Sequence, residues 1–401
     1  MRILADENMP AVARLFADVA TEIRTVPGRT LTPEQLAAVD VLLVRSVTRV
    51  DAALLAQASQ LRFVGTATIG TDHIDQPLLQ QRQIAFASAP GCNAAGVVDY
   101  VLGALLAQYA DNPAALAQAR VAVVGAGNVG GRLTTRLRAL GLAVMVCDPP
   151  REQACLPDQD GVSEPCFVSL QEAFTADIVC CHTPYTRAGD WPTHHMISAD
   201  LLQQLPLRAL FLNAGRGGVV SSAALLAATR ARPDLRLVLD VWDPEPDLPL
   251  ALLERAVMGT GHIAGYSAEG RVRGTLMLRQ ALAEKLDLPP PELKVQDLLP
   301  PVPPLRLDSD AAGAEQPVAQ AWQLLQQAVL QVCDPLGDDA RFRAALHAVP
   351  AARRGQAFDQ YRKTYAAERD RRELASVPVE RAGLSATAAD LLHRAGFAVH
   401  S

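Results

Sequence analysis

The sequence predicts an α/β protein with two doubly wound parallel sheets in series, followed by a smaller α+β region. Short apolar runs alternate with helix-like stretches before about residue 95. The alternation resumes after residue 119, where a glycine-rich turn follows the first run. Prolines then become frequent after about residue 287. Alternating strands and helices are typical of parallel sheets that are covered by helices on both faces.

The N-terminal part contains four apolar runs of the length of buried strands. They are Arg2–Ala5, Val39–Val44, Leu61–Gly65 and Ile84–Ala87. Between them, Pro33–Ala38 and Ala52–Ala58 place apolar residues at helical spacing. This alternation predicts the first Rossmann-like sheet.

The second part begins with an Ala-rich stretch over residues 94–119, which predicts one long helix. Five strands are expected after it, with a helix at Asn128–Leu140 between the first two. The strands are Arg120–Val124, Ala143–Cys147, Ile178–His182, Ala209–Asn213 and Leu237–Asp240. This pattern predicts a second doubly wound unit.

The C-terminal part differs in composition from the two sheets. Leu288–Leu305 contains seven prolines, which indicates a linker or an extended edge. Helices are expected at Val318–Val332 and Arg341–His347, followed by the charged stretch Gln356–Leu374. We therefore expect residues 291–401 to form a third, small domain.

Composition and charge exclude several classes of function. The 401 residues are enough for two or three domains, and 49 % of them are apolar, so the chain can bury sizeable cores. The net charge of −6 without a basic stripe argues against a nucleic-acid partner. Acidic residues appear by position 6 and no long uncharged apolar run follows, so neither a signal peptide nor a membrane span is expected. Seven scattered cysteines favour reduced thiols and a cytoplasmic protein.

The glycine-rich turn has the pattern of a dinucleotide-binding loop. Gly125, Gly127 and Gly130 form G-x-G-x-x-G between an apolar strand and a helix, with Asn128 and Val129 inside the pattern. The glycines allow a tight turn, and the helix N-terminus attracts the pyrophosphate.

An acidic residue follows this loop at nearly the expected distance. Asp148 ends the next strand, 18 residues after Gly130 (148 − 130). Its carboxylate would accept a hydrogen bond from a ribose 2′-hydroxyl and repel a 2′-phosphate, so the sequence favours NAD over NADP. A glycine-rich turn that binds nothing is the alternative, and Arg151 nearby leaves a 2′-phosphate as the minor possibility.

Three polar residues that follow strands form a candidate catalytic set, Arg216, Glu245 and His262. A neutral imidazole can accept a hydroxyl proton near neutral pH. A carboxylate can orient that ring, and an Arg can bind a substrate carboxylate and polarise the oxygen at C2. Taken singly, the residues could be a helix-capping arginine, a solvated turn glutamate and a hydrogen-bonded core histidine. Because all three follow a predicted nucleotide-binding motif in the sequence, each after a strand, together they favour the oxidation of a 2-hydroxy acid.

The run from Gly125 to His262 resembles the D-isomer-specific 2-hydroxyacid dehydrogenase family, whose catalytic Arg, Glu and His match the three residues above. The resemblance implies a substrate domain made of residues 1–95 and 265–290, and an NAD domain made of residues 96–264. It also implies that Thr183, Ala214, Asp240 and Gly265 contact NAD together with Asp148.

Further motifs resemble one narrower group within that family, whose members oxidise a phosphorylated four-carbon 2-hydroxy acid during pyridoxal 5′-phosphate synthesis. The motifs are Asp6–Pro10, Val44–Thr48, Gly65–His73, Ala89–Asn93, His262–Tyr266 and the tail segments Phe358–Asp359, Arg362–Tyr365 and Arg371–Glu373. The resemblance implies a homodimer formed through the C-terminal domain, and substrate contacts from Ser46, Thr68 and Tyr266.

Arg45 is added here on chemical grounds as a charge-assisted donor to the substrate phosphate. A salt bridge at the sheet edge is the alternative for this residue.

The paired His194 and His195 suggest a metal, but without further ligands at useful spacing we expect a surface loop and no metal site. Extra residues at Ala366–Asp370, before Arg371, depart from the pattern of the group.

Two other functions are compatible with the sequence. One is a related enzyme of the phosphoglycerate or hydroxypyruvate type, although the tail lacks the βαββαβ pattern of a regulatory amino-acid-binding module. The other is a corepressor-like NAD sensor without activity, which would need a disordered, partner-facing tail.

Overall fold

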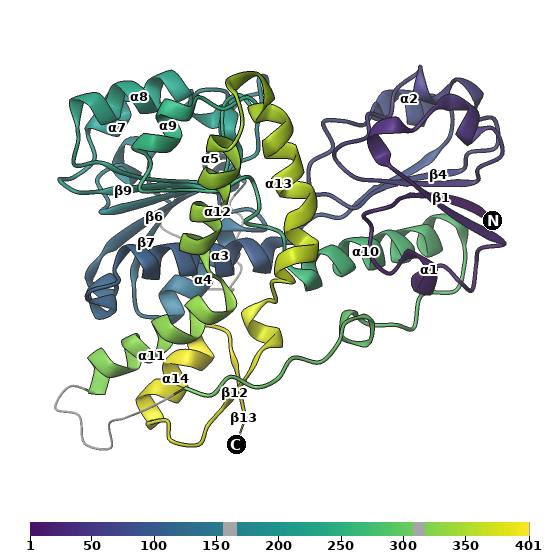
Figure 1. Cartoon of the computed structure of the whole chain (residues 1–401). Helices are drawn as coiled ribbons and strands as arrows, with labels where there is room; N and C mark the ends of the chain where they lie inside the picture. Colours follow the sequence, from purple (N-terminus) through teal and green to yellow (C-terminus); the bar gives the residue numbers. More distant parts are fainter. Residues whose placement is uncertain (155–166, 308–316, 401) are drawn as a thin grey trace. The chain divides into compact units, whose positions relative to one another are not determined.

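The structure is a computed structural model that describes residues 1–154, 167–307 and 317–400 (Figure 1). Contacts divide the chain into two compact units. The first consists of Met1–Asn93 and Ser267–Pro301, and the second of Ala94–Tyr266 and Val302–Ser401. No helix among the described residues is long and apolar enough to cross a membrane.

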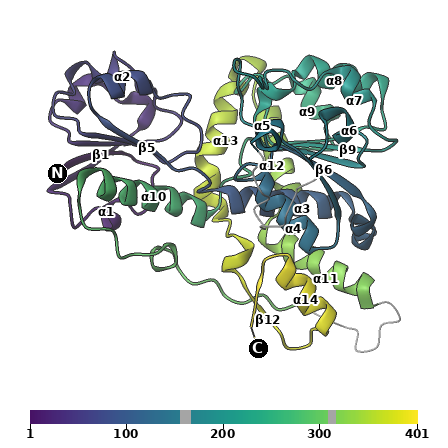
Figure 2. The same ribbon diagram turned by 180° about the vertical axis from the view of Figure 1, so that it is seen from behind.

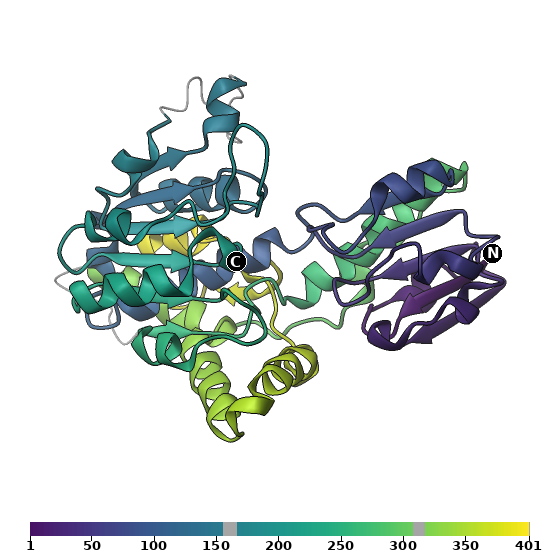
Figure 3. The ribbon, with the colours of Figure 1, turned by 90° about the horizontal axis from the view of Figure 1, so that it is seen from above.

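The first unit is built on a five-stranded parallel sheet with the order β2-β1-β3-β4-β5. Its strands are β1 (Arg2–Asp6), β2 (Glu22–Val26), β3 (Val41–Val44), β4 (Phe63–Thr66) and β5 (Ala85–Ser88). Side chains of β1 and β3 alternate between two apolar cores, because successive residues of a strand point to opposite faces. The helix α10 (Ala268–Leu286) and the short α1 (Val12–Leu15) cover one face, as Figure 3 shows for α10. The helix α2 (Gln76–Gln81) belongs to the opposite face.

Two features of this unit differ from the sequence prediction. The strand β2 was not expected, because it is a largely exposed edge strand and lacks an apolar run. The segments predicted as helices at Pro33–Ala38 and Ala52–Ala58 form only short 3₁₀ turns, at Pro33–Leu36 and Leu54–Gln57.

The second unit contains a six-stranded parallel sheet with the order β11-β10-β9-β8-β6-β7. Its strands are β6 (Arg120–Val124), β7 (Ala143–Cys147), β8 (Ile178–Cys181), β9 (Leu210–Asn213), β10 (Arg236–Leu239) and β11 (Met258–Gly259). One face packs against α3 (Ala94–Gln108) and α4 (Gly130–Ala139). The helices on the other face are α6 (Leu170–Ala173), α7 (Ala199–Gln203), α8 (Ser222–Ala231) and α9 (Leu250–Arg255), and Figure 2 shows both layers. The remaining helix α5 (Pro149–Gln153) follows β7.

The long helix predicted over residues 94–119 is shorter than expected. The helix α3 ends at Gln108, and a 3₁₀ segment begins at Pro113. Proline has no N–H to continue a helical ladder, which explains the break. The strand β11 was also missed, since two residues are too few to show a pattern.

The C-terminal part is α+β, as predicted. It contains α11 (Pro317–Val332), α12 (Pro335–His347), α13 (Arg354–Arg369), α14 (Ala386–Arg394) and the parallel pair β12 (Pro378–Glu380) and β13 (Ala398–His400). Trp322, Leu325 and Val329 of α11 belong to the same apolar core as α3 and β6. The expected third domain therefore shares its core with the nucleotide fold, and its role in dimerisation stays a prediction.

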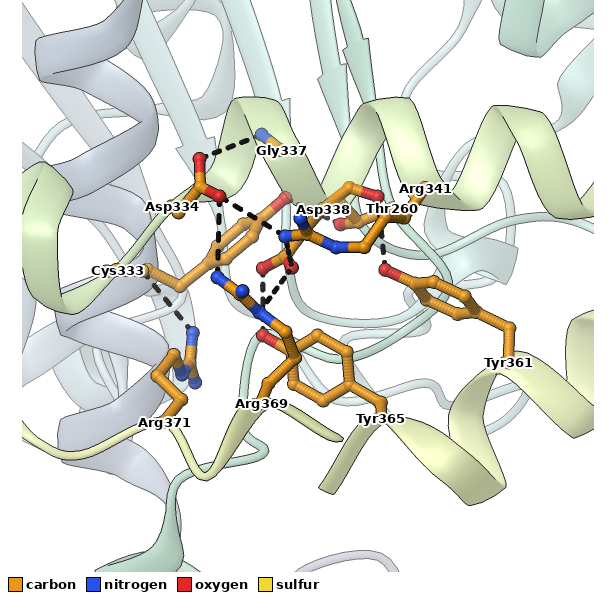
Figure 4. Close-up of polar contacts among 11 residues, drawn as sticks. Thr260, Cys333, Asp334, Gly337, Asp338, Arg341, Tyr361, Tyr365, Arg369 and Arg371 are labelled. Atoms are coloured by element: carbon orange, nitrogen blue, oxygen red, sulfur yellow. Dashed lines mark hydrogen bonds and ion pairs between the residues drawn. The ribbon is translucent and has the colours of Figure 1, made fainter. Parts of the chain in front are cut away.

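A buried carboxylate joins α12 to α13 (Figure 4). Asp338 is fully buried and accepts hydrogen bonds from the Tyr365 hydroxyl at 2.8 Å and from Arg341 at 2.6 Å. The hydroxyl of Tyr361 donates to the backbone carbonyl of Asp338 at 3.1 Å. Because buried polar groups with satisfied hydrogen bonds rigidify their surroundings, this cluster fixes the position of α13 on the second unit.

Five cysteines in the described residues are buried and form no disulfide, namely Cys92, Cys147, Cys180, Cys181 and Cys333. Burial raises the pKa of Cys180 to about 12, so this thiol stays protonated and unreactive. Cys155 and Cys166, which the sequence analysis also treats as reduced, lie outside the described residues.

Candidate active site

The loops after β6, β8, β9 and β10 lie against one another at the carboxyl edge of the six-stranded sheet. A Cβ atom added to Gly125 would lie 2.8 Å from the Thr183 nitrogen, and one added to Gly217 would lie 1.8 Å from the Trp242 oxygen. The strand order reverses between β6 and β8, because β7 lies on one side of β6 and all later strands lie on the other. Ligands of open α/β sheets bind at such a reversal point.

The glycine-rich loop has the backbone that a dinucleotide requires. Gly125 has a φ of 89°, which L side chains rarely adopt. A Cβ atom at Gly130 would lie 1.8 Å from the Gly125 oxygen, so only glycine fits where α4 begins. A Cβ atom at Gly127 would meet no atom within 4 Å among the described residues, so the backbone here is open to a ligand. These features fit a pyrophosphate seated against the helix N-terminus.

Asp148 lies beside this loop, as the sequence predicts. Its Oδ2 accepts a hydrogen bond from the Ala126 nitrogen at 2.7 Å, and its Oδ1 accepts one from the Arg151 nitrogen at 3.1 Å. A carboxylate has about four acceptor positions, so the side chain can still bind ribose hydroxyls.

The loop after β8 places two unsatisfied side chains beside Gly125. Neither ring nitrogen of His182 nor the hydroxyl of Thr183 has a hydrogen-bond partner among the described residues, although all three atoms are buried. Burial lowers the pKa of His182 to about 4, so its ring is neutral. Buried polar atoms normally have hydrogen-bond partners, and a dinucleotide bound at this edge would supply them. Thr183 is among the NAD contacts that the family resemblance implies, whereas His182 has no such signal in the sequence because it ends an apolar run.

His262 and Glu245 form a hydrogen-bonded pair. The Nδ1 atom of His262 lies 2.8 Å from Oε2 of Glu245, and Oε1 of Glu245 accepts a hydrogen bond from the Trp242 nitrogen at 2.9 Å. Burial alone would raise the pKa of Glu245, but the nearby charge and hydrogen bond of His262 outweigh burial and lower it. Glu245 is therefore ionised and can orient the imidazole through Nδ1.

Asp240 holds the backbone of the His262 loop. Its Oδ1 accepts hydrogen bonds from the Thr260 hydroxyl at 2.7 Å and the Ile263 nitrogen at 2.8 Å, and its Oδ2 accepts one from the Ala264 nitrogen at 3.0 Å. Within that loop His262 has a φ of 58°, which is uncommon for a residue other than glycine. These contacts give Asp240 a structural role, and its contact with NAD stays a prediction.

Arg216 lies on the loop after β9, between buried Ala214 and the close contact at Gly217. Its Nη1 donates to the Gly215 carbonyl at 3.0 Å, and its own carbonyl accepts a hydrogen bond from Asn213 at 3.1 Å. The side chain is half-buried. The loops that carry Arg216 and Glu245 are thus adjacent, while His262 contacts Glu245 directly.

The expected substrate contacts in the first unit surround the end of β4. The Thr68 hydroxyl donates to the Gly70 carbonyl at 2.8 Å and lies 2.8 Å from the Thr66 hydroxyl, which is 2.9 Å from His73 Nε2. Burial lowers the pKa of His73, although Asp72 opposes this effect. Ser46 is exposed and Arg45 half-buried in the loop after β3. The sequence analysis quoted His73 only as part of a motif and gave it no role.

The paired histidines have partners that their sequence did not indicate. His195 Nε2 lies 2.7 Å from Asp243 Oδ2, and the two rings stack with centroids 3.9 Å apart. The hydroxyl of Tyr185 lies 3.0 Å from His194 Nδ1. No group of three or more His, Cys, Asp or Glu side chains that could hold a metal occurs in the described part of the chain.

Residues 105–264 match the D-isomer specific 2-hydroxyacid dehydrogenase NAD binding domain. Residues 310–396 match a domain of unknown function. The TT0316 protein from Thermus thermophilus superposes with a TM-score of 0.60 at 26 % identity, covering 73 % of this chain and 100 % of that one. NAD⁺-bound 3-phosphoglycerate dehydrogenase from Entamoeba histolytica superposes with a TM-score of 0.59 at 18 % identity, covering 73 % and 99 %, which supports the fold.

The fold, the glycine loop and the matched domain define an NAD-binding oxidoreductase of the 2-hydroxyacid dehydrogenase class. The chain is 45 % identical over 400 residues to erythronate-4-phosphate dehydrogenase from Marinobacter nauticus, covering 99 % of each chain. It is 47 % identical over 370 residues to the enzyme of that name from Azotobacter vinelandii, covering 92 % of this chain and 93 % of the relative. The chain belongs to the erythronate-4-phosphate dehydrogenase family, which confirms both the broad and the narrow resemblance seen in the sequence.

Proposed function

We propose that this protein oxidises 4-phospho-D-erythronate with NAD to (R)-3-hydroxy-2-oxo-4-phosphooxybutanoate, as a step in pyridoxal 5′-phosphate synthesis. The observation that carries the proposal is the 2.8 Å contact between His262 Nδ1 and Glu245 Oε2, at the same carboxyl edge of the sheet as a glycine loop that fits a dinucleotide. Relatives that share 43–47 % of the sequence over nearly the whole chain bear the corresponding name.

In this proposal His262 is the base. With Nδ1–H donated to Glu245, the other ring nitrogen, Nε2, is free to accept the proton of the C2 hydroxyl. Glu245 then stabilises the positive charge that forms on the ring. NAD, when bound, accepts the hydride from C2. The half-buried setting of both side chains strengthens their interaction relative to water.

Arg216 binds the substrate carboxylate and polarises the C2 oxygen. Its guanidinium is planar, permanently charged and able to make two parallel hydrogen bonds, which suits both tasks. The substrate also contacts Arg45, Ser46, Thr68 and Tyr266, with Arg45 directed to the phosphate. The residues that hold NAD are Gly125, Gly127, Asn128, Val129, Gly130, Asp148, Thr183, Ala214, Asp240 and Gly265.

The setting of the enzyme is also part of the proposal. We assign residues 1–95 and 265–290 to substrate binding, residues 96–264 to NAD binding, and residues 291–401 to dimerisation. The protein works as a cytoplasmic homodimer, in keeping with the buried thiols of the described residues, which form no disulfide.

A substrate panel tests the proposal. Purified protein is assayed for NADH or NADPH formation from 4-phospho-D-erythronate, D-erythronate, 3-phospho-D-glycerate and D-glycerate. We expect the highest kcat/KM with 4-phospho-D-erythronate and NAD. Faster turnover of 3-phosphoglycerate would contradict the substrate, and the absence of turnover with any of these acids would favour an NAD-sensing protein.

A further inference from the structure

Arg362 is a cation of the C-terminal part that lies next to the catalytic loop. Its guanidinium carbon lies 5.8 Å from the centre of the Tyr266 ring and 5.9 Å from that of Phe358. Its Nε atom is buried and has no hydrogen-bond partner among the described residues. Native proteins seldom leave a buried donor unsatisfied, so an acceptor from outside the described residues is expected.

The neighbours of Arg362 belong to the site described above. Tyr266 lies four residues after His262, and its nitrogen donates to the Ile263 carbonyl at 2.8 Å, so its ring is fixed to the catalytic loop. The ring also meets Tyr365 of α13 edge-on, with centroids 6.0 Å apart. The side chains of Arg362 and Tyr365 are three residues apart on one face of α13, and both contact Tyr266.

Arg362 interacts electrostatically with Glu245, whose two carboxylate oxygens already accept hydrogen bonds from other residues. Burial acts to raise the pKa of Glu245, and the charge of Arg362 helps to lower it, together with the larger effects of His262 and of the hydrogen bond from Trp242. Both oxygens of Glu245 already bind other groups, since Oε1 accepts from Trp242 and Oε2 from His262. No hydrogen bond or ion pair joins Arg362 to Glu245 among the described residues, and Nε of Arg362 has no partner there.

We propose that Arg362 binds the phosphate of the substrate, so that the C-terminal part of the chain takes part in substrate recognition. A guanidinium is the side chain best suited to phosphate oxygens, and here it is held in place by the two rings. In the proposed function, on which this inference rests, Arg216 binds the substrate carboxylate and Arg45 is directed to the phosphate, so Arg362 adds a second cation for the phosphate. Arg362 also lies outside the matched NAD domain, in the part of the chain that matches a domain of unknown function.

Contacts with α12 hold the helix α13 in place within the second unit. Tyr361 and Tyr365, on either side of Arg362, both donate hydrogen bonds to Asp338 (Figure 4). Phe358 meets Phe342 of α12 edge-on, with centroids 5.6 Å apart. Arg362 is thus presented by a helix that is anchored on both sides, and it needs little reordering to bind an anion.

The test compares two substrates that differ only in the phosphate. For Arg362→Gln we expect kcat/KM for 4-phospho-D-erythronate to fall roughly 10- to 100-fold, as expected for the loss of charged hydrogen bonds. The much slower turnover of D-erythronate should stay within about twofold, because that substrate lacks the group that Arg362 binds. Arg362→Lys, which keeps the charge but loses the fork of donors, should lie between the two proteins.

The control is Lys363→Gln, which removes an exposed positive charge from the same helix and should change neither rate. NADH binding and the thermal unfolding midpoint are measured for every variant. If Arg362→Gln does not fold, Arg362→Lys is compared with the wild type on the same two substrates. Equal losses on both substrates, or no loss on either, would overturn the assignment to the phosphate. A wild-type protein that does not prefer the phosphorylated substrate would instead overturn the proposed function itself.

Discussion

At the scale of single residues, His262 is held by its backbone as well as by its side chain. Its nitrogen donates to the Asp240 carbonyl at 2.7 Å, and the next two nitrogens donate to the Asp240 carboxylate. Backbone conformations with positive φ cost free energy for residues other than glycine, and they persist when the surroundings fix them. Asp240 provides that restraint, so the ring is positioned before any substrate arrives.

The role of His262 as a base leads to a prediction for His262→Ala. We expect kcat to fall by about two to four powers of ten, the usual contribution of a general base. NAD affinity should change little, because the proposed contacts to NAD come from other residues. Steady-state rates of NADH formation and fluorescence titration with NADH measure the two quantities separately.

The matched control is His347→Ala, which removes an exposed histidine on α12. Its kcat should equal that of the wild type. A His262→Ala protein that kept a rate near the wild type would show that another group, such as the His195–Asp243 pair, accepts the proton.

The sequence predicted some of these residues and not others for a physical reason. Glu245 and His262 follow consecutive strands, and parallel strands bring such positions to one edge. The contact of Arg362 with Tyr266 joins positions 96 residues apart (362 − 266) through the packing of α13. His182 was missed because its neighbours in sequence are those of a buried strand, whereas its significance lies in its lack of partners.

At the scale of elements, a buried ion pair connects α3 and α4. Asp99 of α3 is 3 % exposed, and its Oδ1 lies 3.5 Å from Arg136 Nη1 of α4. Its Oδ2 accepts a hydrogen bond from the Leu374 nitrogen at 2.9 Å. Burial raises the pKa of Asp99 to about 6, although Arg136 opposes this effect.

This raised pKa predicts how stability depends on pH. The folded state binds the proton of Asp99 up to about pH 6, whereas the unfolded chain releases it near pH 4. The contribution of Asp99 is therefore complete below about pH 4 and is lost as pH rises to about 6, by about 3 kcal/mol in total. Asp99→Asn, which cannot titrate, should gain stability relative to the wild type over that window.

Urea denaturation of the wild type and of Asp99→Asn at several pH values between 4 and 7 gives this difference. Asp111→Asn, at an exposed position after the same helix, is the control and should follow the wild type at every pH. Parallel curves for the wild type and Asp99→Asn would mean that Asp99 has an ordinary pKa in the folded protein.

Elements were predicted well where their apolar runs are buried and poorly where they are not. The strands β3, β4, β6, β8 and β9 are buried in their interiors, and all five were found in the sequence. The edge strand β2 has three exposed residues out of five and gave no signal. An edge strand pairs through its backbone on one side only, so its side chains need not be apolar.

At the scale of the whole molecule, the chain passes from one unit to the other three times, after residues 93, 266 and 301. Residues 267–301 return to the first unit, and residues 302–401 pack with the second. The proline-rich stretch allowed the sequence analysis to place a boundary there. It could not disclose that the segment after the boundary completes the core of the nucleotide fold, because that packing depends on the surfaces of α3 and α11 together.

The shared core predicts that the C-terminal part and the nucleotide fold unfold together. Leu325 of α11 is fully buried in a cluster that also contains Leu102 of α3 and Val121 of β6. Leu325→Ala should cost about 2–5 kcal/mol and lower hydrogen-exchange protection in β6 and β8 as much as in α11. Leu42→Ala, in the core of the first unit, is the matched control and should lower protection in the five-stranded sheet. If the loss caused by Leu325→Ala were confined to residues 317–400, the C-terminal part would be an independently stable domain, as the sequence first suggested.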